Sequence, residues 1–195
     1  MISRDTFDLI KGRHSQYGSW AVWADVTSGP KSNVGDLRVL DPDQNPSLLN
    51  TLRNDVIMLG LNLSRFQPSA FANFHDPSPA GQDYKIRYAF TGTPYYGAYM
   101  TDLIKGVVML ESNDLVRHVA GQPELVTGSI STLLDEFHDL GAARPTVIAF
   151  GNDAYRLALR HIPSSQYSRM VVVTHYSHYI SQEDYRRRVL VQMRP

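Results

Sequence analysis

The fold is decided by the stretch Val56-Ile57-Met58-Leu59-Gly60-Leu61, which is short, continuously apolar and partly β-branched. Such a stretch is typical of a strand buried on both faces, as in a parallel sheet that helices cover. Residues 146–151 and 170–174 follow the same pattern, and residues 98–103 are a fourth candidate. These stretches therefore predict a sheet at the centre of the molecule.

Helical patterns alternate with these stretches, which predicts an α/β domain with a central parallel sheet. The helix signals are apolar residues three and four apart, together with capping residues. Four helices are expected: over Arg4–Lys11, over Ser129–Leu140 ahead of Gly141, from a cap at Asn152 or Asp153 to His161, and from a cap at Ser181 to Met193.

Length and composition suit a single domain over residues 1–195, because 43% of the residues are hydrophobic and 19% are charged. Residues 29–46 are rich in Pro, Gly, Asn and Asp, so residues 1–46 are expected to form an N-terminal helix and loop extension. Its aromatic side chains Tyr17, Trp20 and Trp23 are expected in the core.

The absence of cysteine excludes disulfides, cysteine nucleophiles and thiolate-bound clusters. The histidines form no metal-ligating pattern, so neither a metal nor a cofactor is expected. No stretch of about 18 apolar residues occurs, and the N-terminus lacks a signal-peptide pattern. We therefore expect no membrane segment, a cytoplasmic location and a monomer.

The formal net charge is zero, which argues against a large electrostatic footprint for nucleic acid but permits a few phosphate contacts. The run Arg186-Arg187-Arg188 is the densest cluster of basic residues. A solvated helix face is the interpretation that we favour for this run.

Two loops follow buried strands, and ligands bind at the carboxyl ends of strands in open α/β sheets. The first loop is Gly60-Leu61-Asn62-Leu63-Ser64, in which Asn62 either orients a water molecule or satisfies loop backbone groups. The second is Thr174-His175-Tyr176-Ser177-His178, in which a neutral His175 either donates to an oxygen that gains negative charge or is a core histidine. Ser177 is a candidate phosphate contact, and His178 is expected nearer solvent or phosphate.

An unusually aromatic stretch lies between the first strands and is flanked by Arg65, Lys85 and Arg87. Flat side chains beside basic ones suit stacking on bases, although an ordinary core explains most of them. Only one or two are expected to face a ligand. The aromatic residues are Phe66, Phe71, Phe74, Tyr84, Tyr88, Phe90, Tyr95, Tyr96 and Tyr99.

The order of these motifs resembles the uracil-DNA glycosylase superfamily over roughly residues 55–193. A strand ending in Gly-Leu-Asn comes first, then an aromatic loop, a Tyr-Met-Thr-Asp strand, a Phe-Gly-Asn-Asp-Ala strand end and a His-x-Ser motif. The resemblance implies a three-layer α/β/α domain with four parallel strands between helices. It also implies hydrolysis of the N-glycosidic bond of a base flipped out of DNA, without a cofactor.

The resemblance also implies roles for individual residues. Asn62 matches the water-positioning residue and His175 the residue that supports the departing base, while Ser177 matches the phosphate-contacting serine. The base-binding set is Leu61, Phe74 as the stacking aromatic, and Asp102 near the position that reads the base edge. The DNA-binding set is Ser64, Lys85, Ser177, His178 and Tyr179, with Tyr179 and Ile180 where relatives insert an apolar wedge.

The chain departs from the motifs of the family at several positions. Leu63 replaces a proline of the first motif, and Tyr176 and His178 replace the two prolines of the second. An ionised Asp102 accepts but does not donate, so it suits a base edge that offers an amino group, as in cytosine or adenine. Candidate substrates are therefore uracil, another deaminated base, or a modified cytosine as in phage DNA, which would suit phage defence.

Two other functions remain open from the sequence. One is a catalytically weak relative that binds nucleic acid or senses damage. The other is a hydrolase of small nucleosides or esters on a similar scaffold, for which the Gly-x-Ser-x-Gly elbow of ester hydrolases is missing.

Overall fold

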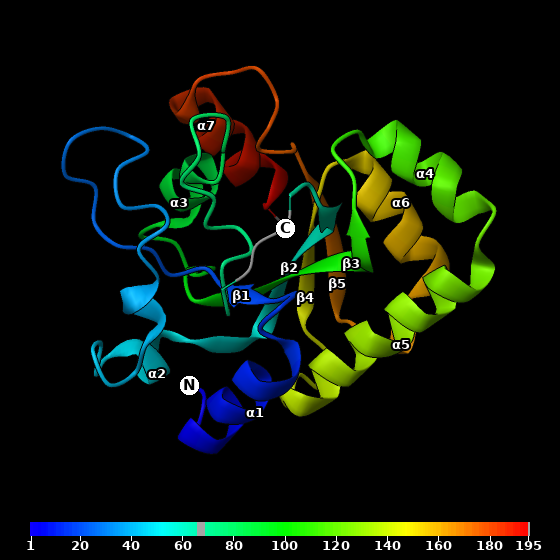
Figure 1. Ribbon diagram of the computed structural model, residues 1–195, viewed down its shortest axis with the longest axis horizontal. Coiled ribbons are helices and arrows are strands. Elements are labelled where there is room, and N and C mark those ends of the chain that lie inside the picture. The colour runs from blue at the N-terminus through cyan, green and yellow to red at the C-terminus, as the bar shows by residue number, and fades with distance from the viewer. Residues whose placement is uncertain (66–68, 195) are drawn as a thin grey trace.

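Five strands form one mixed sheet in the computed structural model, which describes residues 1–65 and 69–194 (Figure 1). The order of the strands across the sheet is β1-β3-β2-β4-β5. Strands β2 to β5 are mutually parallel, and the two-residue β1 joins β3 in antiparallel orientation. The bounds are β1 Ser19–Trp20, β2 Arg53–Leu63, β3 Ala98–Val108, β4 Thr146–Phe150 and β5 Arg169–Val173.

The α/β class expected from the sequence is therefore confirmed, whereas the sheet has five strands and not four. Sequence patterns missed β1 because a two-residue strand carries no periodicity. Among the aromatic residues named above, Phe66 lies outside the described residues.

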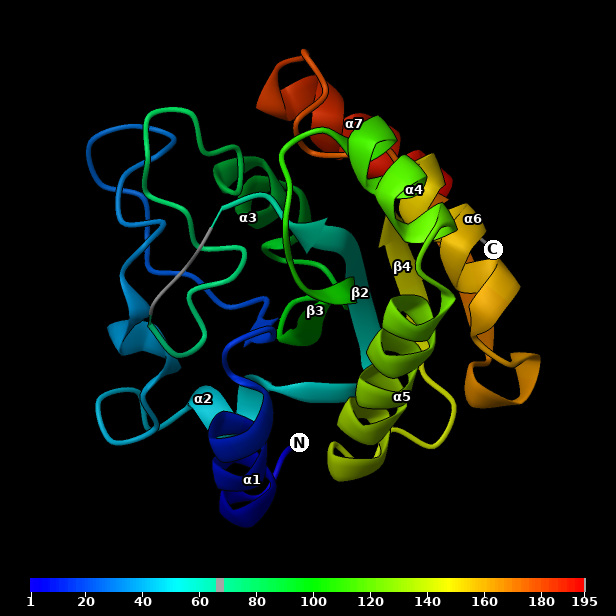
Figure 2. The same cartoon turned by 45° about the vertical axis from the view of Figure 1, so that its right-hand side comes forward.

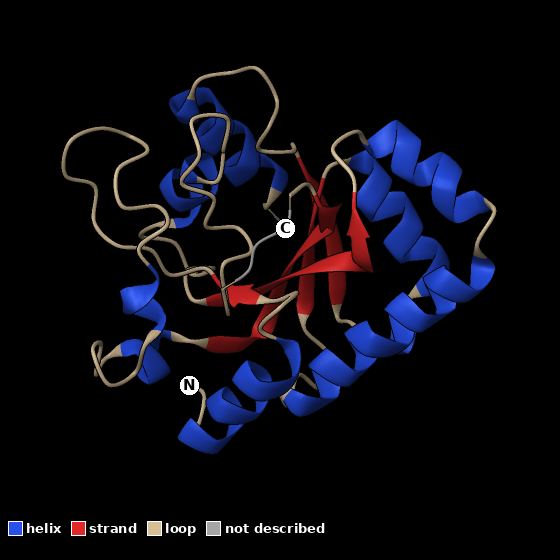
Figure 3. Ribbon diagram, in the orientation of Figure 1, coloured by secondary structure: helices blue, strands red, loops and turns tan. Residues whose placement is uncertain are grey.

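Helices pack on both sides of this sheet (Figure 3). Side chains of α1, α4, α5 and α6 pack with Ile57, Leu59 and Leu61 in one core. Side chains of α3 and α7 pack with Val56 and Met58 in the other. The helices are α1 Arg4–His14, α2 Leu48–Thr51, α3 Tyr84–Phe90, α4 Ser112–Ala120, α5 Pro123–Asp139, α6 Asn152–His161 and α7 Gln182–Gln192.

This alternation explains why the deciding stretch is apolar throughout. Successive side chains of a strand point to opposite faces, and here both faces carry a core. The parallel pairing also brings the carboxyl ends of β2 to β5 to one edge of the sheet, where the loops after them gather (Figure 2).

The ends of the helices test the expected caps. Ser181 caps α7, because its side-chain oxygen accepts from the Asp184 N–H, and Gly141 follows α5 with a φ of 68°. The expected cap of α6 was wrong: the cap is Gly151, with a φ of 87° and no side-chain hydrogen bond. Asp153 instead accepts from the Ser112 hydroxyl at 2.8 Å. Helix α5 begins at Pro123 and not at Ser129.

The N-terminal segment is part of the sheet and its cores. Ser19 pairs with Met100 of β3, and Trp20 is completely buried, as expected of a core aromatic. Trp23 is buried as well, and its Nε1 donates to the Phe74 carbonyl at 3.2 Å. Within the stretch expected to be loop, a short 3-10 helix spans Leu37–Leu40. Residues 1–46 therefore supply an edge strand and core side chains in addition to the helix and loop that were expected.

In the described residues, no helix is long and apolar enough to cross a membrane.

Candidate functional site

Gly60 and Asp102 face each other on neighbouring strands at the carboxyl edge of the sheet. They are register partners in β2 and β3. A Cβ atom added to Gly60 would lie 2.2 Å from Asp102 Oδ1 and 3.0 Å from Phe74 Cζ. Only glycine leaves room here for a carboxyl group and an aromatic ring side by side. The fold thus brings together Phe74 and Asp102, two of the residues singled out from the sequence.

Asp102 is a buried acid without a cationic hydrogen-bond partner among the described residues. Its Oδ2 accepts from Asn73 Nδ2 at 2.8 Å, and Asn73 Nδ2 also donates to the Tyr17 carbonyl. Burial raises the pKa of Asp102 from 3.8 to about 7, against the opposing effects of Asn73 and of the charge on Lys105. Near neutral pH this carboxyl group therefore exists in both protonation states.

Asp83 is a second buried acid near the same place. It lies just before α3, and its Oδ2 accepts from the Asp76 backbone N–H at 2.7 Å. Burial is the main cause that raises the pKa of Asp83 to about 7, and the charges of Asp76 and Asp102 add to it. Two buried carboxyl groups with raised pKa values, one of which raises the pKa of the other, are characteristic of functional sites.

Phe74 is held in a constrained backbone conformation, with a φ of 63°, and is buried. Its ring packs at an angle against Phe150 and Tyr176, with centroid distances of 6.2 and 6.4 Å. The ring therefore faces Gly60 from within the core that α3 and α7 cover. Its role as the stacking aromatic stays a prediction.

Tyr176 packs against the Phe74 ring as well, although sequence reasoning gave it no role. Its ring packs edge-on against Phe150 at 5.4 Å, and burial and the nearby charges of Asp83 and Asp102 raise its pKa well above 10.0. The only sequence signal for a role of Tyr176 was that it replaces a proline of the second motif. Asn73 and Asp83 were missed as well, because their partners are distant in sequence.

His175 lies at the end of β5, and its hydrogen bonds define its tautomer. The Ser177 backbone N–H donates to Nδ1 at 3.2 Å, and the Ser177 hydroxyl lies 2.8 Å from the same atom. Burial lowers the pKa of His175 to about 4, so the ring is neutral at pH 7. Because Nδ1 accepts, the proton of the neutral ring lies on Nε2, where it is available to an external oxygen.

The His175 ring stacks on Tyr176 at 4.3 Å and lies against the start of α6. A Cβ atom added to Gly151 would lie 3.4 Å from the His175 Cβ and 3.6 Å from its Cδ2. These distances are ordinary contacts, so the glycine at 151 is explained by its φ of 87° and not by the space that the ring needs.

Asn62 is half-buried, and its amide group binds the backbone. Nδ2 donates to the carbonyls of Leu63 and Met109 at 2.8 Å each and to that of Val107 at 3.4 Å. These bonds tie the end of β2 to the segment after β3. The Oδ1 atom is left as the acceptor that could hold a water molecule. In the described part of the chain, no hydrogen bond joins Asn62 to His175.

The other residues expected to contact a base or DNA differ in exposure. Ser64, Ser177 and His178 are exposed, and Tyr179 is fully so. Lys85 is buried, burial lowers its pKa, and its Nζ donates to the His178 carbonyl at 3.0 Å. The Leu61 side chain packs in the core on the opposite face of the sheet from Val56 and Met58, so its side chain lies away from Asp102. These roles stay predictions.

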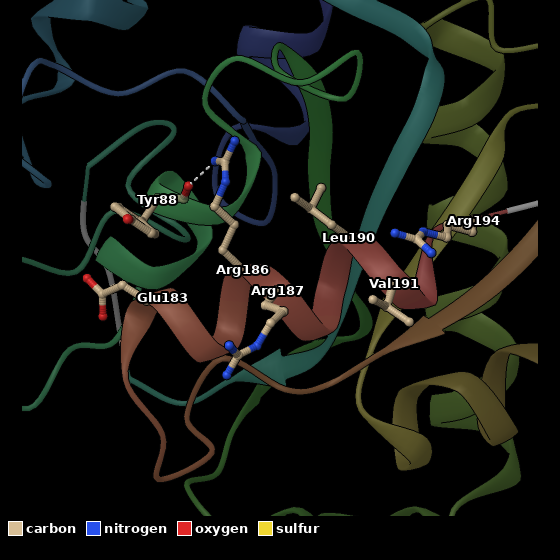
Figure 4. A pocket seen from close by; sticks show the side chains of 7 residues that line it. All are labelled: Tyr88, Glu183, Arg186, Arg187, Leu190, Val191 and Arg194. Carbon is tan, nitrogen blue, oxygen red and sulfur yellow. Dashed lines mark hydrogen bonds between the residues drawn. The ribbon is translucent and has the colours of Figure 1, made fainter.

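The arginine run on α7 is partly structural. Arg186 Nη1 donates to the carbonyls of Tyr88, Ala89 and Thr91, which end α3, as the dashed line to Tyr88 indicates (Figure 4). Arg187 pairs with Asp184 one turn earlier, and Arg188 is exposed. The solvated-face interpretation therefore holds for Arg188, whereas Arg186 joins two helices.

Among the described residues, no three His, Asp or Glu side chains gather closely enough to hold a metal ion. Comparison with known proteins gives no match to a family model and no match to a curated protein.

Proposed function

We propose that the protein is a DNA glycosylase that hydrolyses the N-glycosidic bond of a base flipped out of the stack. The observation that carries this proposal is the placement of an acid and an aromatic ring over the bare backbone of Gly60. A flat ring suits the face of a base, and a carboxyl group suits its edge. The proposal includes the three-layer arrangement, with the four parallel strands β2 to β5 between helices.

In this proposal, Asp102 selects the base by the hydrogen-bonding pattern of its edge. The ionised carboxylate accepts from an exocyclic amino group, as in cytosine or adenine, and the protonated form donates to a carbonyl, as in uracil. Since its pKa is about 7, both forms are populated at neutral pH. Amino-bearing bases are the substrate class that the ionised form favours.

His175 supports the departing base. As the glycosidic bond breaks, negative charge grows on the base, so a donor placed at a base oxygen stabilises the transition state more than the ground state. The neutral ring carries its proton on Nε2 and needs no protonation step before it donates.

Asn62 holds the attacking water through Oδ1, because its amide protons already bind carbonyl groups. An amide cannot take a proton from that water, so positioning is its contribution. Ser64, Ser177 and His178 supply the few phosphate contacts that a neutral protein allows, and the exposed Tyr179 enters the gap left by the flipped base. Lys85 holds the His178 carbonyl and so positions that loop.

A second candidate is a relative that binds nucleic acid without cleaving it. Two observations favour it: backbone carbonyls occupy the Asn62 amide protons, and the Tyr176 ring packs beside Phe74 where a base would stack. In this case the exposed loop would bind DNA, but Tyr176 would stay packed against the Phe74 ring in place of a base.

The test is incubation of the protein with oligonucleotides that carry uracil, hypoxanthine, cytosine or modified cytosines, followed by alkali to break abasic sites. The glycosylase proposal predicts strand breaks that fall by roughly 100-fold or more in Asn62→Ala and His175→Ala. His118→Ala, an exposed histidine on α4, is the matched control and should keep full activity. Binding without breaks across the panel would instead support the second candidate, and base release from free nucleosides alone would indicate a nucleoside hydrolase.

A further inference from the structure

A cavity of about 530 Å³ lies between the segment after β1 and helices α3 and α7. Its volume falls within the ~300–1,000 Å³ typical of small-molecule sites. Aromatic rings and charged groups line it, among them those of Trp23, Tyr84, Tyr88, Tyr96, Arg87, Arg186 and Asp25.

Arg87 is the main polar feature of this cavity. The side chain is more than nine-tenths buried, yet no carboxylate forms a salt bridge with it among the described residues. Nη1 donates to the carbonyls of Ala24 and Ser32, and Nη2 donates to that of Pro30. A guanidinium has five N–H donors, so two of them, including that on Nε, have no protein acceptor in the described chain.

A buried cation without a counter-charge is costly, and burial lowers the pKa of Arg87. Asp25 also lines the cavity and attracts Arg87 at longer range, but it forms no ion pair with it within 4.0 Å. Arg186 lines the same cavity, and its donors bind helix carbonyls and no carboxylate of the described residues. The charges that face the cavity are thus two guanidinium groups and one carboxylate, which favours an anionic ligand.

The walls favour a flat ligand. Tyr84, Tyr88 and Tyr96 line the cavity together with Trp23, and the Arg186 guanidinium lies 5.9 Å from the centre of the Tyr88 ring. The side chains of Tyr88 and Arg186 lie next to each other in the close view of the adjoining surface (Figure 4). Aromatic rings and guanidinium planes both stack on nucleobases, and guanidinium groups bind phosphate in a forked geometry.

We propose that this cavity is a nucleotide-binding site, in which the base stacks among the tyrosines and the phosphate binds the free edge of Arg87. Asp25 offers an acceptor for a sugar hydroxyl or a base amino group. The nucleotide is either a free nucleoside monophosphate or one residue of a single-stranded DNA, since both present the same chemistry.

Trp23 would connect this site with the strand ends. It lines the cavity, its ring lies 5.4 Å from that of His75, and its Nε1 donates to the Phe74 carbonyl. A ligand against Trp23 therefore lies one hydrogen bond away from the residue that faces Gly60.

Calorimetric titration of the full chain with adenosine monophosphate, adenosine and inorganic phosphate tests the proposal without any assay of base release. We expect saturable binding of the monophosphate at one site, and binding of adenosine and of phosphate that is at least about tenfold weaker. Tyr88→Ala removes a stacking ring and should weaken binding of the monophosphate by about tenfold. Arg87→Lys should weaken this binding as well.

Two matched variants outside the cavity, Tyr155→Ala on α6 and Arg188→Ala on α7, should bind as the wild type does. Tyr88 is partly exposed, so its variant should fold even if Arg87→Lys loosens the segment that Arg87 holds, and circular dichroism checks both. A single-stranded oligothymidylate that competes with the monophosphate identifies the DNA residue as the occupant, and absence of competition identifies the free nucleotide. Equal binding of phosphate alone, no saturable binding, or unchanged binding by Tyr88→Ala would overturn the proposal.

Discussion

Strand β3 carries buried ionisable groups on both of its faces, and these groups have different partners on the two faces. On one face, Lys105 Nζ binds both oxygens of Glu136, at 2.8 and 2.9 Å, and the Thr101 hydroxyl at 2.6 Å. On the other, Asp102 accepts a hydrogen bond from the Asn73 amide, and its charge helps to raise the pKa of a second buried acid, Asp83. The first cluster is neutralised within the protein, and the second is not.

We propose that the difference separates a structural cluster from a binding site. A buried ion pair with satisfied donors contributes to a defined core and leaves nothing for a ligand. Asp102, a buried acid with a pKa of about 7 and an amide as its hydrogen-bond partner, retains hydrogen-bonding capacity. We therefore assign function to the Asp102 face, and the predictions below test that distinction.

The largest effect is expected from breaking the Lys105–Glu136 pair. Lys105→Met leaves Glu136, which is completely buried, without its cation, and should lower the free energy of unfolding by about 3–5 kcal/mol. Urea unfolding measures this loss. The double variant Lys105→Met/Glu136→Leu should recover most of this loss. A double variant as unstable as the single one would show that lost packing, and not an unpaired charge, causes the loss.

The next effect concerns the pH dependence of stability at Asp102. Its pKa rises from 3.8 to about 7 on folding, so it stabilises the fold below pH 4 and loses that contribution as pH rises through 7. His75 and His175, whose pKa values fall from 6.5 to about 4, act in the opposite sense across the same interval. The stability of the wild type alone is therefore not diagnostic.

The diagnostic quantity is the difference between Asp102→Asn and the wild type. The variant cannot ionise, so its stability relative to the wild type should increase by about 2–3 kcal/mol between pH 4.5 and pH 8. Unfolding titrations at several pH values measure this. A difference that stays constant across the interval would mean that Asp102 has an ordinary pKa.

Gly60→Ala should have an intermediate effect, a loss of about 2 kcal/mol, because its Cβ would overlap Asp102 Oδ1. The matched control is Gly128→Ala in α5, where nothing lies within 4 Å of the new atom and helix propensity should improve stability slightly. If the overlap is the cause, Asp102→Ala in the same chain should relieve part of the loss in thermal unfolding.

The smallest effect is expected for Lys85→Met, which removes the hydrogen bond to the His178 carbonyl. The loss should be about 1 kcal/mol, with faster proteolysis confined to the loop after β5. Lys11→Met, on an exposed position of α1, should change neither measurement. A larger loss for Lys11→Met than for Lys85→Met would contradict the packing described here.

Sequence patterns predicted the parts of the fold that depend on local chemistry. The apolar stretches gave β2, β4 and β5, and Ser181 marked the start of α7, because burial on both faces and capping leave local signatures. Helix α3 was missed, because the aromatic residues of Tyr84–Phe90 were interpreted as core or stacking residues and not as part of a helix. Strand β1 was missed because its pairing with Met100 is long-range.

The candidate site was predicted to a smaller extent, for a physical reason. Asp102 and Phe74 were singled out by motif order. Whether Asp102 has a cationic partner, however, depends on the side chains that three separate segments bring to Gly60. The Leu61 side chain belongs to the opposite face, which strand alternation decides, and the inward position of Tyr176 depends on tertiary packing. No local pattern encodes these outcomes.

The most direct test of the central claim is the pH dependence of base excision around pH 7. For amino-bearing bases, excision should rise between pH 6 and pH 8 as Asp102 ionises, whereas for uracil it should fall. Asp102→Asn should remove both dependences and shift the preference toward uracil, because an amide donates to a carbonyl at every pH. The same pH slope for both classes of base, unchanged in Asp102→Asn, would contradict the assignment of Asp102 as the residue that reads the base.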